Sequence, residues 1–196
     1  MELKKQIEII KNARLIALAK FIIPFCIAGV AVLLFWLAGP ETYTKYATVF
    51  SIYSFVPIGG PLAAVVAGLR LDISRIALIS FLIFTDGILA LFLVWNFDYA
   101  KKIPGLGKLV ERVEESGEKA IQKYKWAKRF GFIGVVILVI FPFQWTGAAV
   151  GSIVGRLLIG MTPLMTLLAV VLGTFIRSTL LVYFSWLVTL LVKPFF

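Results

Sequence analysis

Apolar residues run through most of this chain, and polar residues gather in a few places between them. Residues 18–38, 73–97 and 163–192 are each predominantly apolar. About 20 apolar residues in a helix cross the ~30 Å hydrocarbon core of a bilayer, so the pattern predicts three full transmembrane spans. The last of these segments would be ~45 Å long as a helix, and we therefore expect it to tilt, kink or protrude.

Two polar segments flank these spans. Residues 1–17 carry Leu3, Ile7 and Ile10 at helical spacing among charged side chains, which predicts an interfacial amphipathic helix leading into the first span. Residues 98–130 carry a similar apolar stripe, so we expect amphipathic helices on the cytoplasmic membrane surface there. The nine Lys and Arg residues of this segment favour contact with anionic lipid headgroups, and we expect no nucleic acid partner.

Two further apolar stretches, residues 47–71 and 130–159, are interrupted by helix-breaking residues. Each is either a kinked span or a re-entrant helical hairpin, which enters and leaves on the same face and has its tip at the break. Non-helical backbone at membrane depth is tolerated only inside protein or along a wet cavity, so we expect the tips inside the bundle. The expected tip residues are Pro57, Gly59, Gly60, Pro61, Pro142 and Gly147.

The distribution of basic residues distinguishes hairpins from spans. If both stretches are hairpins and the N-terminus is cytoplasmic, fifteen of the 20 Lys and Arg residues lie inside and four lie outside, with Arg177 within the last span. If both stretches cross the membrane, the N-terminal basic cluster and the basic residues of 98–130 fall on opposite sides. The positive-inside rule favours the hairpins, in a multi-pass protein of the cell (inner or plasma) membrane with a cytoplasmic N-terminus.

The two interrupted stretches resemble each other. "PIGGPLAAVVAGLR" and "PFQWTGAAVGSIVGR" both begin with Pro, reach AAV six positions later and continue through a Gly and an Arg, with a small insertion after AAV in the second. An odd number of full spans separates them, which would invert one copy relative to the other. Inverted repeats with broken helices are typical of secondary transporters. The alternative is that the small residues merely let helices pack closely.

These patterns predict an all-α integral membrane protein with a single membrane domain. It would contain an inverted repeat of two opposed re-entrant helical hairpins, about three full spans and amphipathic surface helices. The composition agrees, with 61% hydrophobic and 15% charged residues. The chain has no His and one Cys, which excludes His-dependent triads and HExxH zinc sites. We therefore expect no catalytic residues, no metal and no cofactor.

Two ionisable residues lie deep in predicted spans, Asp86 and Arg177. Each costs at least ~2.5–3.5 kcal/mol at a helix centre unless it is paired or hydrated. The repeat alignment brings them to similar depths, so we expect them to interact. They would form either a structural ion pair that locks two helices or a gated pair. In the gated pair, Asp86 takes a proton when a substrate anion or a conformational change pulls Arg177 away.

Other polar residues are weaker candidates for contact with substrate. Gln144, Trp145 and Thr146 would add hydrogen-bond donors at the second tip, or Gln144 and Thr146 would only satisfy the broken backbone. Arg70, Asp72 and Arg156 lie at expected membrane interfaces, where they would be anchors or would contact lipid headgroups.

The segment "ILVIFPFQWTGAAVGSIVGRLLIGM", with the basic segment before it, resembles the small multidrug export protein family, which is placed in the DedA/VTT superfamily. The family's Pro-x-x-x-Thr-Gly-Ala pattern stands here as Pro142, Thr146, Gly147 and Ala148. The resemblance implies opposed re-entrant hairpins, linkage to the proton-motive force, and translocation of lipid or lipid-linked phosphates. This chain differs at both tips: it lacks the superfamily's acidic residue near the first, and Gln144-Trp145 replaces an Arg at the second.

The sequence as a whole therefore favours a secondary transporter or a lipid translocase (scramblase-like) protein. It would move a lipid, a lipid-linked phosphate or a small amphipathic substrate, with or without proton coupling. The alternative is a non-catalytic scaffold that shapes the membrane, which needs no polar cavity between the tips. An enzyme is disfavoured because Asp86 has no second intramembrane carboxylate beside it. The expected partners are membrane lipids and a second copy of the chain.

Overall fold

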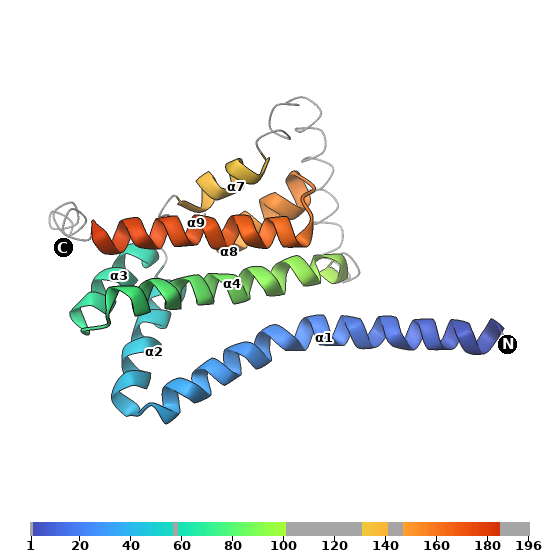
Figure 1. Cartoon of the computed structure of the whole chain (residues 1–196), viewed down its shortest axis with the longest axis horizontal. Helices are drawn as coiled ribbons and strands as arrows, with labels where there is room; N and C mark the ends of the chain where they lie inside the picture. The colour runs from blue at the N-terminus through green and yellow to red at the C-terminus, as the bar shows by residue number, and fades with distance from the viewer. Residues whose placement is uncertain (1, 57–58, 101–130, 141–146, 185–196) are drawn as a thin grey trace.

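The computed structural model describes residues 2–56, 59–100, 131–140 and 147–184, and the regular structure within them is all helical. Three long helices contain stretches of 21 to 23 residues that are apolar enough to cross a membrane: α1 (Glu2–Leu37), α4 (Arg75–Ala100) and α9 (Pro163–Tyr183). Figure 1 shows that successive long helices run in opposite directions. The three predicted spans are therefore present as helices of the required length.

The first long helix has no break between its polar and apolar parts. The expected interfacial segment, residues 1–17, and the expected span, residues 18–38, belong to one helix that begins at Glu2 and ends at Leu37. Pro24 lies inside this helix. Figure 1 shows that α1 bends along its length and that its C-terminal half diverges from α4.

The last long helix differs in length from the expected span of residues 163–192. It begins at Pro163, where the Thr162 side chain accepts a hydrogen bond from the Met165 amide, and it ends at Tyr183 with Phe184 as its C-cap. Its 21 residues make ~31 Å of helix, which matches a hydrocarbon core of ~30 Å. The described helix therefore needs no tilt or kink to fit. Residues 185–196 lie outside the described part.

The first interrupted stretch forms two short helices, α2 (Pro40–Phe55) and α3 (Gly60–Arg70), which pack against each other. Helix α2 begins earlier than the expected residue 47. At the break, Gly59 adopts a left-handed conformation with φ of 74°, which a residue without a Cβ adopts at little cost. The pair starts beside the end of α1 and finishes beside the start of α4, at one end of the bundle (Figure 1).

The second interrupted stretch also forms helices on both sides of its break. Helix α7 (Gly131–Ile140) precedes it, and α8 (Ala148–Ile153) follows and continues into a π-helical segment, η2 (Val154–Leu158). A Cβ on Gly131 would lie 2.5 Å from the Ile159 side chain, so the start of α7 adjoins the end of η2. This stretch therefore begins and ends at one end of the bundle, the end opposite to that of α2 and α3 (Figure 1).

Two apolar clusters form the core. One joins α2, α3 and the first part of α4, and the other joins α7, α8 and the first part of α9. On α4 the two clusters are represented by Leu82 and Ala90, and on α9 by Val182 and Val170. The buried polar residues Asp86 on α4 and Thr174 and Arg177 on α9 lie between these positions.

Candidate functional site

A buried ion pair joins the middles of α4 and α9. The Arg177 Nη2 atom lies 2.7 Å from Oδ2 of Asp86, and the two residues are 1% and 3% exposed. The structure thus brings together the two deep ionisable residues that the sequence singled out.

Two hydroxyl groups complete the hydrogen bonding of the Asp86 carboxylate. Thr174 donates from Oγ1 to Oδ2 at 2.6 Å, and Tyr53 donates from its hydroxyl to Oδ1 at 2.7 Å. The Tyr53 oxygen also accepts a hydrogen bond from Arg177 Nη2. One phenol therefore bridges both charged groups, and it comes from α2, the first helix of the first interrupted stretch.

The guanidinium also reaches the second interrupted stretch. Arg177 Nη1 donates to the backbone carbonyl of Val139, near the end of α7, at 3.3 Å. A Cβ built on Gly147, the N-cap of α8, would lie 3.4 Å from the same Nη1 atom. Arg177 is thus in contact with both sides of the second break, while Tyr53 links it to the first. One cluster connects the two interrupted stretches and two of the long helices.

The electrostatics of this cluster depend on mutual compensation. An isolated charge at this depth would carry a large desolvation cost, which an opposite charge and good hydrogen bonds offset. The pair is electrically neutral when Asp86 is ionised. Protonation of Asp86 would leave one uncompensated positive charge.

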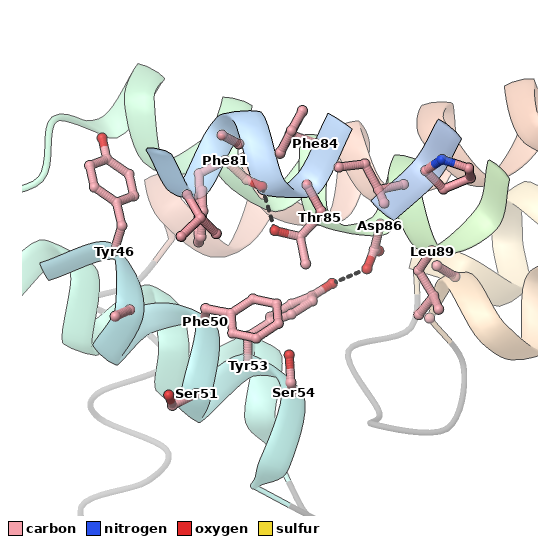
Figure 2. Close-up of a pocket in the computed structure, with 18 of the residues that line it drawn as sticks. Tyr46, Phe50, Ser51, Tyr53, Ser54, Phe81, Phe84, Thr85, Asp86 and Leu89 are labelled. Carbon is pink, nitrogen blue, oxygen red and sulfur yellow. Dashed lines mark hydrogen bonds between the residues drawn. The ribbon is translucent and has the colours of Figure 1, made fainter. Parts of the chain in front are cut away.

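A cavity of about 1100 Å³ adjoins the ion pair. Its walls come mainly from α1, α2 and α4, with smaller contributions from α3, α8 and α9. They are largely apolar and aromatic, with Asp86, Arg177 and the Tyr53 ring at one place. Figure 2 shows Tyr53 pointing at Asp86, with Phe50 and Phe84 nearby. Asp86 and Arg177 are the charged residues among those that line it. The site thus combines a large apolar volume with one compact polar spot.

Sequence reasoning did not select Tyr53 or Thr174 as site residues. Thr174 had a usable signal, because it lies three residues before Arg177 and therefore shares its helix face. Tyr53 had a weaker one, as a polar-tipped aromatic side chain just before the first break. Its contact with Asp86 spans 33 residues and depends on how α2 packs against α4.

The expected tip residues are placed only in part. Pro61 and Gly147, one from each break, line the same cavity. Gly59 is the N-cap of α3, and Gly60 is its first residue. The remaining expected tip and donor residues lie outside the described part of the chain: Pro57, Pro142, Gln144, Trp145 and Thr146.

The three candidate headgroup contacts lie at helix ends. Arg70 is the last residue of α3, and Asp72 follows it in a turn with φ of 56°. Arg156 lies in η2 and donates a hydrogen bond from Nη1 to the Met161 carbonyl at 2.9 Å. This bond connects η2 to the turn before α9. Contact of these residues with headgroups remains a prediction.

Comparison with known proteins places this arrangement in a family. A sequence model of the family described as "Putative small multi-drug export protein" matches residues 59–180, more than half of the chain. The chain belongs to this family. Asp86, Thr174 and Arg177 lie in the matched region, whereas Tyr53 and α1 precede it. No curated protein and no solved structure matches the chain.

Proposed function

We propose that this protein is a secondary transporter that binds an amphipathic substrate in the cavity and uses Asp86 and Arg177 as its gate. The observation that carries the proposal is the position of the ion pair, which is buried and yet forms part of the wall of a large apolar cavity. A pair that served only to lock helices could lie anywhere in the core. Ligand sites typically combine an apolar cavity with a few polar groups.

The proposal includes an architecture of two opposed re-entrant hairpins, α2–α3 and α7–α8, as in the DedA/VTT superfamily. Each helix pair begins and ends at one end of the bundle, and the two pairs use opposite ends (Figure 1). A glycine shortly before the Arg at the end of each stretch supports the repeat. A Cβ on Gly68 would lie 2.7 Å from Leu78, and a Cβ on Gly155 would lie 2.7 Å from Thr166, so each stretch packs closely on the long helix that follows it.

The charge balance of the site indicates which substrates it suits. When Asp86 takes a proton, the site becomes positive, and in a low-dielectric interior that charge favours a compensating anion. An amphipathic anion bound together with one proton would restore neutrality. A lipid, a lipid-linked phosphate and other amphiphiles with one anionic group all fit this description. We propose proton-coupled movement of such a molecule across the cell membrane.

Flux in proteoliposomes tests this proposal. The parent protein and the variants Asp86→Asn, Arg177→Gln and the double variant would be assayed with a labelled phospholipid, a polyprenyl phosphate and a cationic dye, with and without a proton gradient. Removing one partner of a buried pair typically costs ~3–5 kcal/mol, whereas removing both can be nearly neutral. We therefore expect the double variant to be better folded than either single variant.

The flux results separate the alternatives. If the pair is a gate, the stable double variant loses proton-dependent transport, because the carboxylate that takes the proton is gone. If the pair is a lock, the double variant still transports. The absence of any flux in the folded parent protein, with all three probes, would reject the transporter and favour a membrane-shaping scaffold.

A further inference from the structure

The two halves of α1 are held against the protein in different ways. The residue at which they meet, Pro24, is buried, whereas only 6% of the apolar window of α1 is buried, against 50% for α9. Proline is a common cause of bending within a helix. The C-terminal half of the helix diverges from α4 (Figure 1), and residues of both helices line the cavity.

The bend point is fixed by a specific hydrogen bond. Proline has no backbone N–H, so the carbonyl four residues earlier, that of Lys20, loses its helical donor. Asn96 of α4 supplies the missing donor, with its Nδ2 atom 3.2 Å from the Lys20 carbonyl oxygen. The Phe21 and Phe25 rings also contact Phe92 of α4, at centroid distances of 5.6 and 5.3 Å. This region of α1 is therefore anchored to α4.

The C-terminal half of α1 has a different attachment. The Phe35 ring stacks on Tyr46 of α2 with centroids 4.3 Å apart and meets the edge of Phe81 of α4 at 5.8 Å. Past this contact the helix ends and Gly39 adopts φ of 109°, a conformation that favours glycine and suits a hinge. Between the anchor and this contact, α1 presents small residues, Ala28 and Ala31, to the cavity.

We propose that the part of α1 beyond Pro24 is a lateral gate, and that the hydrocarbon chain of an amphiphile passes through it between the bilayer and the cavity. Pro24 and Gly39 are the two pivots, and the Phe35–Tyr46–Phe81 contact is the latch. The wall between the anchored Phe25 and the latched Phe35 is ~15 Å long at 1.5 Å per residue, which is about half of the ~30 Å hydrocarbon core. The wall thus matches the chain length of one leaflet.

The role of the gate in transport rests on the proposed function, but the experiment that tests the gate measures labelling of the cavity and needs no transport. The test uses photolabelling in vesicles of phosphatidylcholine and phosphatidylglycerol, with either a diazirine fatty acid or a diazirine phospholipid. The latch is locked in the Phe35→Cys/Tyr46→Cys variant, made in a Cys26→Ala background. A short reducible bis-methanethiosulfonate linker joins the two new cysteines. Mass spectrometry then compares adducts on the cavity-lining residues of α4, such as Ile88, with adducts on exposed Leu168 of α9.

The matched control locks the anchored half. The Phe21→Cys/Phe92→Cys variant joins α1 to α4 on the other side of Pro24, where the proposal requires no movement. We expect locking of the latch to lower cavity adducts at least about tenfold, because a locked wall cannot reach an open state that is commonly populated at only about 0.1–10%. Adducts on α9 should not change, and reduction of the linker should restore the cavity adducts.

Three outcomes would overturn the gate: no cavity adducts in the unlocked protein, no effect of the latch lock, or an equal effect of both locks. The two probes distinguish a free amphiphile from a membrane lipid as the source of the chain. If cavity adducts respond to the latch but proteoliposomes show no flux, the gate stands and the transporter proposal fails.

Discussion

The Tyr53 hydroxyl lies 2.7 Å from Oδ1 of Asp86, while Arg177 and Thr174 both bind Oδ2. The carboxylate therefore turns one oxygen toward α9 and the other toward α2. Tyr53 is the contact through which the first interrupted stretch reaches the ion pair. Its ring lines the cavity, so a bound substrate would meet this phenol at the edge of the pair.

Replacing Tyr53 by Phe should destabilise the protein while keeping the ring in place. Both Asp86 and Arg177 would lose a hydrogen-bond partner, and leaving a buried polar group without its partner costs about 1–3 kcal/mol. Thermal unfolding in detergent would measure the loss. Tyr46→Phe, the same change two turns earlier on α2, keeps the stacking on Phe35 and should leave stability unaltered. Equal effects of the two changes would refute a special role for Tyr53.

Gly173 should tolerate no side chain, because α7 crosses α9 at this point. A Cβ there would lie 2.7 Å from the Val139 Cβ and 3.0 Å from the Val136 carbonyl oxygen, both on α7. Overpacking of this kind costs about 1–3 kcal/mol, and the shift of α7 would also move the Val139 carbonyl away from Arg177. The melting temperature of Gly173→Ala should fall.

Gly134 provides the control on the partner helix. A Cβ at Gly134 would meet nothing within 4 Å. Since alanine is a better helix former than glycine by up to about 1 kcal/mol, Gly134→Ala should be neutral or slightly stabilising. A Gly173→Ala protein as stable as Gly134→Ala would show that α7 does not pack on α9 as described.

The tie between Asn96 and the Lys20 carbonyl should depend on Pro24. In the parent protein, Asn96→Leu removes the donor, and hydrogen bonds between membrane helices are worth about 0.6 kcal/mol on average and up to about 1.7. In a Pro24→Ala background, residue 24 regains an N–H that can bind the same carbonyl, so Asn96→Leu should cost less. Unfolding of the parent protein, the two single variants and the double variant measures the coupling between Pro24 and Asn96. Strictly additive effects would contradict the hydrogen bond between Asn96 and the Lys20 carbonyl.

The membrane topology is testable with single cysteines in the Cys26→Ala background. We expect a cysteine at position 41, in the exposed first turn of α2, to react from outside. A cysteine at position 115, within the basic segment, should be protected in sealed right-side-out vesicles and react only after they are opened. Rapid external labelling at position 115 would reverse the orientation that the positive charges predict.

The sequence alone determined the number of long apolar helices and the positions of the breaks between them. These features depend on local properties: runs of apolar residues of sufficient length, and Gly and Pro where a helix cannot continue. The depth of Asp86 and Arg177 followed in the same way, because position along a span is set by counting residues. Their direct contact was expected, since a charge at that depth needs a partner.

Other features required the tertiary structure. Arg156 follows its AAV segment by one residue more than Arg70 follows the AAV segment of the first interrupted stretch, and the π-helical turn η2 lies at this point of the chain. The sequence also did not predict that α9 ends at Tyr183, because the residues that follow are mostly apolar as well.

The composition of the site was decided by packing between segments far apart in the chain. Tyr53 reaches Asp86 only because α2 crosses α4, and the Val139 carbonyl reaches Arg177 only because Gly173 lets α7 approach α9. The cavity exists because α1 diverges from α4 beyond Pro24. The sequence determines where a helix can form and which residues are costly to bury. Which neighbours offset that cost depends on angles and distances between helices, and these are set by side-chain packing across the whole bundle.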